Sequence, residues 1–283
     1  MNSIKPEKHI LALSGGKDSA ALAVYMREKY PSLPLEYVFI DSGCELPETE
    51  LYIQRIMAVL NIQVTRIGGV CKRDGRDFNW WLKQKNYYLP SPKNRWCTEV
   101  LKLIPYSKWL RKNYDGFKIY SYVGLRADEK RNRKGYLDSS NMLVSCHPFV
   151  EQGIVYEDVK HLLESSGIGF PSYYSWRSRS GCFFCFYQTK REWLGLHDNH
   201  PSLFDEAASM EKQDPSTGKR YTWCEGMFLT DLVEHRFEIE KIPPDLEQVK
   251  EKIPKLINTL GNCLHDTNFA LMSRMHGDRF DED

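Results

Sequence analysis

One segment near the N-terminus carries the residue types that bind a phosphate: Ser14, Gly15, Gly16, Lys17, Asp18 and Ser19. Its two glycines let the backbone approach an oxyanion closely, and a helix that starts there would aim free N–H groups at it. Lys17 adds a cation, both serines add hydroxyl donors, and Asp18 can help to position Mg²⁺. The pattern is not the Walker loop, which places more residues before its Gly-Lys pair. The segment therefore predicts a phosphate-binding loop. The alternative is an ordinary strand-to-helix turn whose lysine lies in solvent.

A second group of reactive side chains consists of cysteines. Cys182 and Cys185 have the Cys-x-x-Cys spacing that can grip one metal, and Cys97 lies far upstream. The chain has eight cysteines, and in a reducing compartment such a number suggests metal or redox chemistry more than disulfides. The aromatic residues at 183, 184, 186 and 187 would give a metal centre a dry surrounding. Two alternatives stay open, namely a structural zinc site and cysteines that are only buried or redox-active.

Short apolar runs that alternate with helical patterns must position these residues. Strands are predicted at 9–14, 36–41, 64–68 and 118–124, and helices at 18–30 and 47–60. This alternation predicts an α/β fold with a doubly wound parallel sheet, in which ligands bind at the carboxyl ends of the strands. The phosphate loop would follow the first strand and so lie at that edge.

Beyond residue 170 the strand signals fade, and a smaller helical, cysteine-containing part is expected. Short helices are predicted at 188–199, 201–212, 225–236 and 245–260, whereas residues 70–95 are expected to form a long loop. We therefore divide the chain into a nucleotide-binding core at 1–170 and a helical region at 171–283 that carries the Cys-x-x-Cys pair.

The overall charge excludes a protein that is drawn to nucleic acid by a global basic field. The 39 Lys and Arg residues nearly balance the 38 Asp and Glu residues, for a formal net charge of +1. Any contact with nucleic acid must come from a local patch, and the candidate residues are Arg126, Arg131, Arg133, Arg177 and Arg179. No apolar run is long enough to span a bilayer, and the polar N-terminus lacks a signal-peptide core. The sequence predicts a cytoplasmic protein with no membrane partner.

Several segments, in order, resemble the PP-loop ATP pyrophosphatases, and within them the phosphoadenosine-phosphosulfate-reductase-like branch. They are the loop at 14–19, Asp41–Thr49, Trp96–Lys102, Gly124–Arg131, His147–Val159 and Gly181–Cys185. The resemblance implies the adenine nucleotide alpha hydrolase-like fold and Mg²⁺-dependent cleavage of ATP to AMP and pyrophosphate. It implies catalytic roles for Lys17, Asp18 and Arg126, and a nucleotide site made of the 14–19 loop together with Asp41.

The same resemblance implies an iron–sulfur cluster of the [4Fe–4S] type, bound by Cys97, Cys182 and Cys185. The sequence departs from the cluster-bearing assimilatory reductases at one point, because Trp96 stands where they carry a second adjacent cysteine. The fourth ligand is therefore open: it could be Cys224, Cys146, or no protein residue at all.

Three functions compete. In the first, ATP adenylates an oxygen of an acceptor and sulfur then displaces AMP; here the chain looks most like the pyrophosphatases of bacterial DNA phosphorothioation, with a tRNA base as the next acceptor. That resemblance implies a cysteine desulfurase as sulfur donor and further subunits of a sulfur-modification system. The second function is a phosphoadenosine- or adenosine-phosphosulfate reductase. Such enzymes usually have a degenerate phosphate loop, and the segment around Cys263 resembles their C-terminal cysteine motif but lacks its glycine. The third is a non-catalytic nucleotide-binding module.

Overall fold

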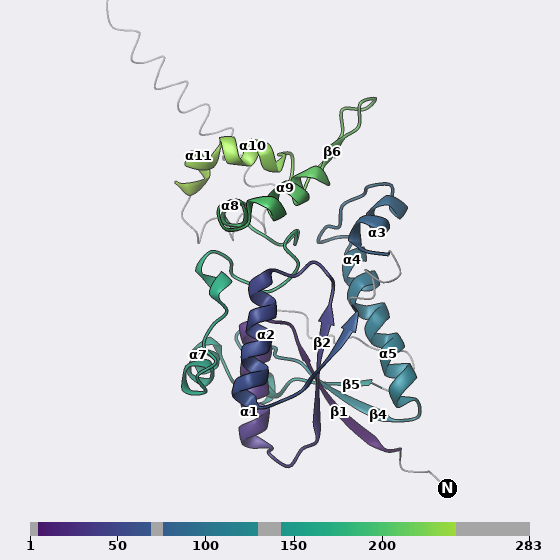
Figure 1. Ribbon diagram of the computed structural model, residues 1–283, viewed down its shortest axis with the longest axis vertical. Coiled ribbons are helices and arrows are strands. Elements are labelled where there is room, and N and C mark those ends of the chain that lie inside the picture. Colours follow the sequence, from purple (N-terminus) through teal and green to yellow (C-terminus); the bar gives the residue numbers. More distant parts are fainter. Residues whose placement is uncertain (1–4, 69–75, 130–142, 242–283) are drawn as a thin grey trace, which may run out of the picture.

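The computed structural model describes residues 5–68, 76–129 and 143–241. Its centre is a sheet of five strands: β1 (Glu7–Leu13), β2 (Leu35–Asp41), β3 (Val64–Gly68), β4 (Lys118–Tyr122) and β5 (Leu143–Cys146). The strand order is β3-β2-β1-β4-β5, and every neighbouring pair is parallel (Figure 1). This arrangement confirms the predicted α/β fold. The direction of the strand order reverses between β1 and β4, and in sheets of this kind ligands bind outside the carboxyl ends of the strands at such a point.

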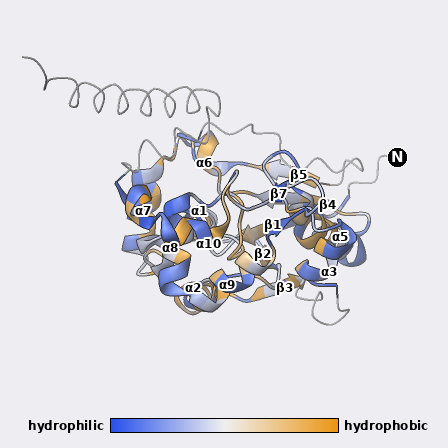
Figure 2. Cartoon of the chain, turned by 90° about the horizontal axis from the view of Figure 1, so that it is seen from above, coloured by the Kyte–Doolittle hydropathy of each residue, from blue (hydrophilic) through white to orange (hydrophobic). Residues whose placement is uncertain are grey.

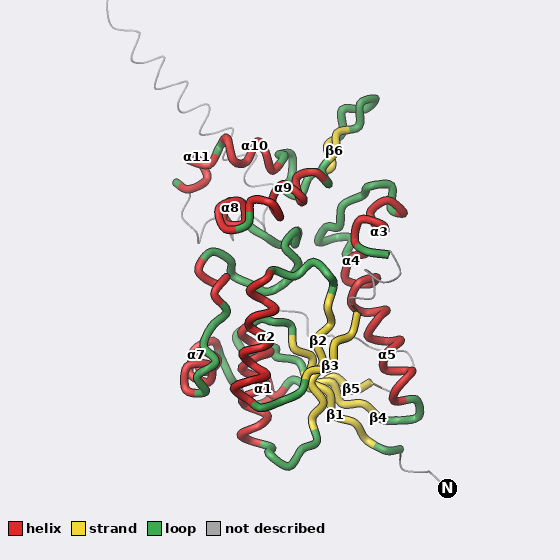
Figure 3. Tube along the Cα trace, in the orientation of Figure 1, coloured by secondary structure: helices red, strands yellow, loops and turns green. Residues whose placement is uncertain are grey.

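Helices cover both faces of the sheet. On one face lie α1 (Lys17–Lys29), α2 (Pro47–Leu60) and α7 (Tyr156–Ser165), and on the other lies α5 (Ile104–Tyr114) (Figure 3). Strand residues alternate between the two cores: Leu11 packs toward α1 and α2, whereas its neighbour Ile10 packs toward α5. Strands buried on both faces read as continuous apolar runs, which is why β1 and β2 could be predicted.

The remaining elements form a helical part above the carboxyl edge of the sheet (Figure 1). They are α3 (Phe78–Gln84), α4 (Trp96–Thr98), the π-helical turn η2 (Glu99–Leu103), the 3₁₀ turn η3 (Ser172–Ser175), α8 (Lys190–Asn199), α9 (Pro201–Ser209), β6 (Lys212–Gln213), β7 (Arg220–Tyr221), α10 (Leu229–Glu234) and α11 (Arg236–Glu240). The short helix α6 (Pro148–Glu151) lies instead with α1 and α7, because its Phe149 is buried in their core. Figure 2 shows α7 and α8 as largely hydrophilic with narrower hydrophobic stretches, as expected of helices that cover a core.

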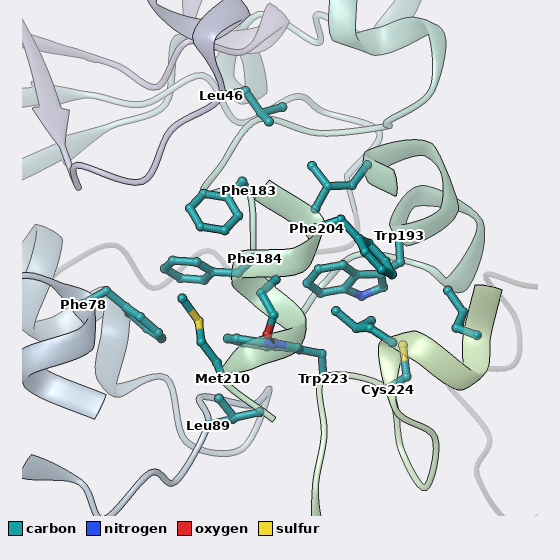
Figure 4. Packing of buried hydrophobic residues seen from close by; sticks show 14 of the residues in the cluster. Leu46, Phe78, Leu89, Phe183, Phe184, Trp193, Phe204, Met210, Trp223 and Cys224 are labelled. Carbon is teal, nitrogen blue, oxygen red and sulfur yellow. Dashed lines mark hydrogen bonds between the residues drawn. The ribbon is translucent and has the colours of Figure 1, made fainter. Parts of the chain in front are cut away.

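An aromatic core holds this helical part together (Figure 4). Phe184 stacks on Trp223 at 5.5 Å between ring centroids and contacts Phe78 at 4.0 Å, while Trp193 lies 5.9 Å from Trp223. Phe183 and Phe184, which follow Cys182, are therefore core residues. This core also takes in Leu46, Phe78, Trp96 and Leu101 from the first half of the chain, so residues from both sides of the predicted boundary at 170 share it.

Two expectations about the elements were wrong, and one strand was missed. The segment 70–95 is not one long loop, because α3 begins at Phe78, where the Asp77 side chain accepts a hydrogen bond from the Trp80 N–H at 2.8 Å. The strand β5 was not predicted, since its four residues include only two aliphatic ones and give no clear period. The helices at 188–199 and 201–212 correspond to α8 and α9. The predicted helix at 225–236 is instead two short helices, α10 and α11, and 245–260 lies outside the described residues.

Candidate active site

The loop between β1 and α1 is built to approach a ligand closely. Gly15 has φ +73°, and a Cβ there would lie 2.4 Å from the Thr49 Cγ2 atom, so only glycine fits. The Ser19 hydroxyl accepts from the Ser14 N–H at 3.0 Å, and the Ser14 hydroxyl accepts from the Gly16 N–H at 3.3 Å. These hydroxyls close the loop on itself and are well placed to turn toward a phosphate.

The three predicted catalytic side chains meet at the start of α1. Asp18 lies between two cations: its Oδ2 atom is 2.8 Å from Lys17 Nζ, and its Oδ1 atom is 2.7 Å from Arg126 Nη1. Lys17 is only 8% exposed. The close packing of β4 against α1 needs Gly124, because a Cβ there would lie 2.6 Å from the Asp18 carbonyl oxygen. Two cations beside one carboxylate can take up the negative charge of a polyphosphate.

Further contacts position both cations. Lys17 Nζ lies 5.5 Å from the centre of the Tyr174 ring, a cation–π arrangement. Arg126 also donates to Asp128 at 2.9 Å and lies 3.4 Å from Glu129. The hydrogen bond from Arg126 lowers the pKa of Asp128. Arg126 is therefore held by carboxylates on several sides.

Asp41 lies at the end of β2 but is engaged on the side of β3. It accepts from the Gly43 N–H at 2.7 Å and pairs with Arg66 at 3.2 Å. Its role in nucleotide binding stays a prediction.

The predicted metal ligands lie in one region, on α4 and on the loop before α8. Cys182 pairs with Glu45 across an antiparallel bridge, and its Sγ atom is 3.1 Å from the Ser42 hydroxyl. Burial raises the pKa of the Cys182 thiol to about 12 and also raises the pKa of Cys97, to which the nearby charge of Cys185 contributes. Within residues 5–68, 76–129 and 143–241, no group of three His, Cys, Asp or Glu side chains is arranged to hold a metal ion. The region gathers the thiols without forming a ready metal site.

The two candidates for a fourth ligand lie in different surroundings. Cys224 is buried in the aromatic core beside Trp223 (Figure 4). Cys146 ends the edge strand β5, where burial and then Glu151 raise its pKa.

Sequence reasoning missed two charged side chains beside Cys182. Glu45 accepts from the Ser42 hydroxyl at 2.8 Å and from Lys102 Nζ at 3.3 Å. Glu45 and Lys102 lie in two of the segments that carried the family resemblance, at 41–49 and 96–102. Their pairing across the fold could have been suspected from those motifs, but it follows from no local pattern.

The nucleotide loop and the cysteine segment touch each other. The Tyr173 hydroxyl donates to the Gly15 carbonyl at 2.6 Å, and the Ser180 hydroxyl donates to the Ser14 hydroxyl at 3.4 Å. A Cβ at Gly16 would lie 2.6 Å from the Ser180 Oγ atom. The segment that leads into Cys182 therefore lies directly on the phosphate loop.

The predicted basic patch is only partly described, and one of its members was wrong. Arg177 is 2% exposed and donates to the Cys182 carbonyl at 2.8 Å, so it is not a surface contact for nucleic acid. Its long apolar stem and its position just before the cysteine pair bury it under that loop. Arg179 is half-buried over the Tyr187 ring at 4.7 Å. Arg131 and Arg133 lie outside the described residues.

Comparison with known proteins places this geometry in a family. The model of the phosphoadenosine phosphosulfate reductase domain matches residues 8–154. The chain belongs to this family. Its members are ATP-using, phosphoadenosine-phosphosulfate-reductase-like enzymes with the adenine nucleotide alpha hydrolase-like fold, as the loop and sheet order lead one to expect.

Two curated relatives are themselves uncharacterized proteins. One, from Methanocaldococcus jannaschii, is 34% identical over 44% of this chain and 24% of its own length. The other, a nin region protein of Escherichia phage lambda, is 25% identical over 44% of this chain and 50% of its own length. The chain thus matches half or less of these relatives.

Two solved structures are similar at low identity. The phosphoadenylyl-sulfate reductase from Candida auris, in a phosphate complex, has a TM-score of 0.47 at 13% identity and covers 63% of this chain and 82% of its own. The U34-tRNA thiolase from Methanococcus maripaludis with its [4Fe–4S] cluster has a TM-score of 0.42 at 15% identity and covers 85% of this chain and 75% of its own. Among the described residues, no helix is long and apolar enough to cross a membrane.

Proposed function

We propose that the chain is an ATP pyrophosphatase that activates an acceptor for sulfur insertion. The observation that carries this proposal is the intact loop at 14–19, with Lys17 and Arg126 on Asp18, in direct contact with the segment that leads to Cys182. An acceptor oxygen attacks the α-phosphorus of ATP, the bond to the β-phosphate oxygen breaks, and pyrophosphate leaves. A sulfur nucleophile then attacks the activated centre of the acceptor, and AMP leaves with the acceptor oxygen.

The three charged side chains of the site have different parts in the first step. Lys17 and Arg126 supply fixed positive charge where the pyrophosphate leaving group becomes more negative. Asp18 holds the two cations in place and can share a Mg²⁺ ion with the phosphates. The free N–H groups at the start of α1 contribute further donors.

The proposed resident cofactor is a [4Fe–4S] cluster on Cys97, Cys182 and Cys185, which when bound would hold the incoming sulfur. The donor chemistry fits, because thiolates are the usual ligands of such clusters. The three cysteines stand on segments that lie close together, since the charges of Cys97 and Cys182 both interact with that of Cys185.

The reaction is tested by its products. With Mg²⁺-ATP the purified chain should form AMP and pyrophosphate, separated by anion-exchange chromatography. Lys17→Ala and Asp18→Asn should each lower the rate about 10²–10³-fold, as expected for a lost charge-stabilising group. Lys29→Ala is the matched control, since Lys29 is an exposed lysine on the same helix. Formation of ADP and phosphate would overturn the assignment.

The acceptor we propose is nucleic acid, with DNA before tRNA, and a cysteine desulfurase as the sulfur donor. Arg131 and Arg133 follow the Arg126 motif in the sequence and supply the local positive charge that a net charge of +1 does not. Replacing both with Glu should abolish sulfur-modified DNA in cells, measured by mass spectrometry of nuclease digests. The control replaces Lys108 and Lys112, exposed on α5, with Glu. Full sulfur incorporation in the Arg double variant, or sulfite release from phosphoadenosine phosphosulfate by the wild type, would favour the reductase instead.

A further inference from the structure

Arg177 is a buried cation that the proposed ATP chemistry does not use. It is among the largest fully buried side chains of the described residues. Its backbone N–H bonds to the Tyr173 carbonyl at 2.9 Å, at the end of η3, and its Nη2 atom donates to the Cys182 carbonyl at 2.8 Å. The same carbonyl accepts from the Cys185 N–H at 3.0 Å. The guanidinium therefore lies directly against the Cys-x-x-Cys turn.

The charge of Arg177 is not neutralised within the described part of the chain. The ion pairs of those residues do not include Arg177, and its Nε and Nη1 atoms have no hydrogen-bond partner there. Arg126, by contrast, contacts Asp18, Asp128 and Glu129. A buried charge without a partner is strongly unfavourable. Such a group is expected to face an anion when the protein works.

One contact relates the Arg177 guanidinium to the Cys185 thiol. A point one Cβ bond from Gly181 lies 3.8 Å from Arg177 Nη2 and 3.9 Å from Cys185 Sγ. Guanidinium and thiol thus approach the same small space, which the absence of a side chain at Gly181 leaves open. On the Cys182 side, the Glu45 carboxylate is paired with Lys102 at 3.3 Å and not with Arg177.

We propose that Arg177 is the counter-cation of an anionic sulfur centre formed by Cys97, Cys182 and Cys185. This inference rests on the proposed function, because the cluster supplies the negative charge. Three thiolates around a cluster carry net negative charge, and net charge and hydrogen bonding around the sulfur atoms set the reduction potential. Arg177 acts through the cysteines and is a positioning residue: it stabilises the cluster and raises its reduction potential.

The test compares the full-length chain with Arg177→Met, Arg177→Lys and Arg179→Gln after anaerobic reconstitution with iron and sulfide. Met keeps the length of the side chain, and replacing a buried ion with an apolar group is often tolerated; a thermal melt checks folding. Arg179→Gln removes the same charge two residues away, from the half-buried side chain over Tyr187. The readouts are iron and sulfide per chain and the midpoint potential followed by electron paramagnetic resonance.

Arg177→Met should bind less iron or show a more negative midpoint potential, Arg177→Lys should recover the wild-type value in part, and Arg179→Gln should resemble wild type. If folded Arg177→Met keeps both the iron content and the potential of wild type, the counter-cation role is refuted while the cluster stands. If Arg179→Gln shifts the potential as much as Arg177→Met, the role is refuted because the effect is not specific to the buried site. A wild-type chain that binds no iron refutes both the cluster and the role of Arg177, whereas pyrophosphate release is measured separately.

Discussion

Gly16 is the residue at which the nucleotide loop comes closest to the cysteine segment. Its φ of −105° is accessible to any residue, so the requirement for glycine comes from its neighbour, the Ser180 hydroxyl. Gly124 is different, because a Cβ there would meet the backbone of Asp18 and Ser19. A serine hydroxyl can be removed by mutation, whereas backbone cannot.

This difference gives a prediction about rescue. Gly16→Ala should lower pyrophosphate release by forcing Ser180 away from the loop, and Gly16→Ala combined with Ser180→Gly should restore much of it. Gly124→Ala should lower the same rate, with no recovery on adding Ser180→Gly. Rates of pyrophosphate release in these four variants, with wild type and Ser180→Gly alone as references, provide the check. If Ser180→Gly fails to improve Gly16→Ala, the contact between the two segments has no effect on the loop.

Local patterns pointed to some of the residues that meet at the candidate site and not to others. The loop at 14–19 could be predicted because its chemistry is contiguous, and Arg126 and the Cys-x-x-Cys pair because each stands in a short motif. The bridge between Glu45 and Cys182 could not, since it depends on how two distant loops pack. The burial of Arg177 could not either, because arginine is usually exposed and only the packing of η3 under the cysteine turn reverses this.

The Glu192 carboxylate in the first turn of α8 is bonded both to the start of its own helix and to the chain just before Cys182. At its N-terminus the Thr189 hydroxyl accepts from the Glu192 N–H at 3.2 Å, and Glu192 accepts from the Thr189 N–H at 2.8 Å, a capping box. Glu192 also accepts from both the N–H and the hydroxyl of Ser178 at 2.6 Å. The cap therefore fixes the chain just before Cys182.

Glu192→Ala should destabilise the protein by about 2–4 kcal/mol, because it removes the cap and leaves the donors of Ser178 and Thr189 unsatisfied. Glu192→Gln keeps an acceptor oxygen and should cost less. Urea unfolding measures both. Glu157, exposed in the first turn of α7, gives the control Glu157→Ala, which should change stability little. Equal losses for Glu192→Ala and Glu157→Ala would show that the cap is not special.

The elements differ in how much of them local sequence encodes. Strands β1 and β2 are buried on both faces, and α8 begins with a clear cap, so both kinds could be predicted. The short helices α10 and α11 depend on the aromatic core for their stability, since isolated helices of this length do not persist. Their bounds could not be obtained from periodicity alone.

At the scale of the whole molecule, one core joins the two halves of the sequence. Leu46, Phe78, Trp96 and Leu101 pack with Trp193 and Trp223. Between α9 and α10, Glu211 accepts from the N–H groups of Trp223 at 2.9 Å and Leu229 at 2.7 Å. Burial raises the pKa of this carboxyl to about 7, so a titratable group lies within a structure on which both halves depend.

This pKa predicts a pH dependence of stability. Because the folded-state pKa of Glu211 lies above the unfolded value of 4.5, the folded state binds the proton more tightly. Its contribution is therefore fully present below pH about 4.5 and is lost as the pH rises through about 7. The change in the free energy of unfolding that this pKa shift can cause is at most about 3 kcal/mol. Glu211→Gln should flatten the fall in unfolding free energy between pH 5 and 8, measured by urea titration at several pH values. An identical fall in wild type and Glu211→Gln would exclude Glu211 as its source.

The hydrogen bond between Ser180 and Ser14 also has a consequence for the order of events. If a bound triphosphate takes over the Ser14 hydroxyl, Ser180 is released, and with it the chain that leads two residues later to Cys182. If this release changes the affinity of the cysteines for their ligand, thermodynamic reciprocity requires that the bound ligand changes the affinity for the nucleotide by the same factor. A coupling of this kind would appear in binding measurements as a nucleotide dissociation constant that differs between the iron-loaded and the iron-free chain.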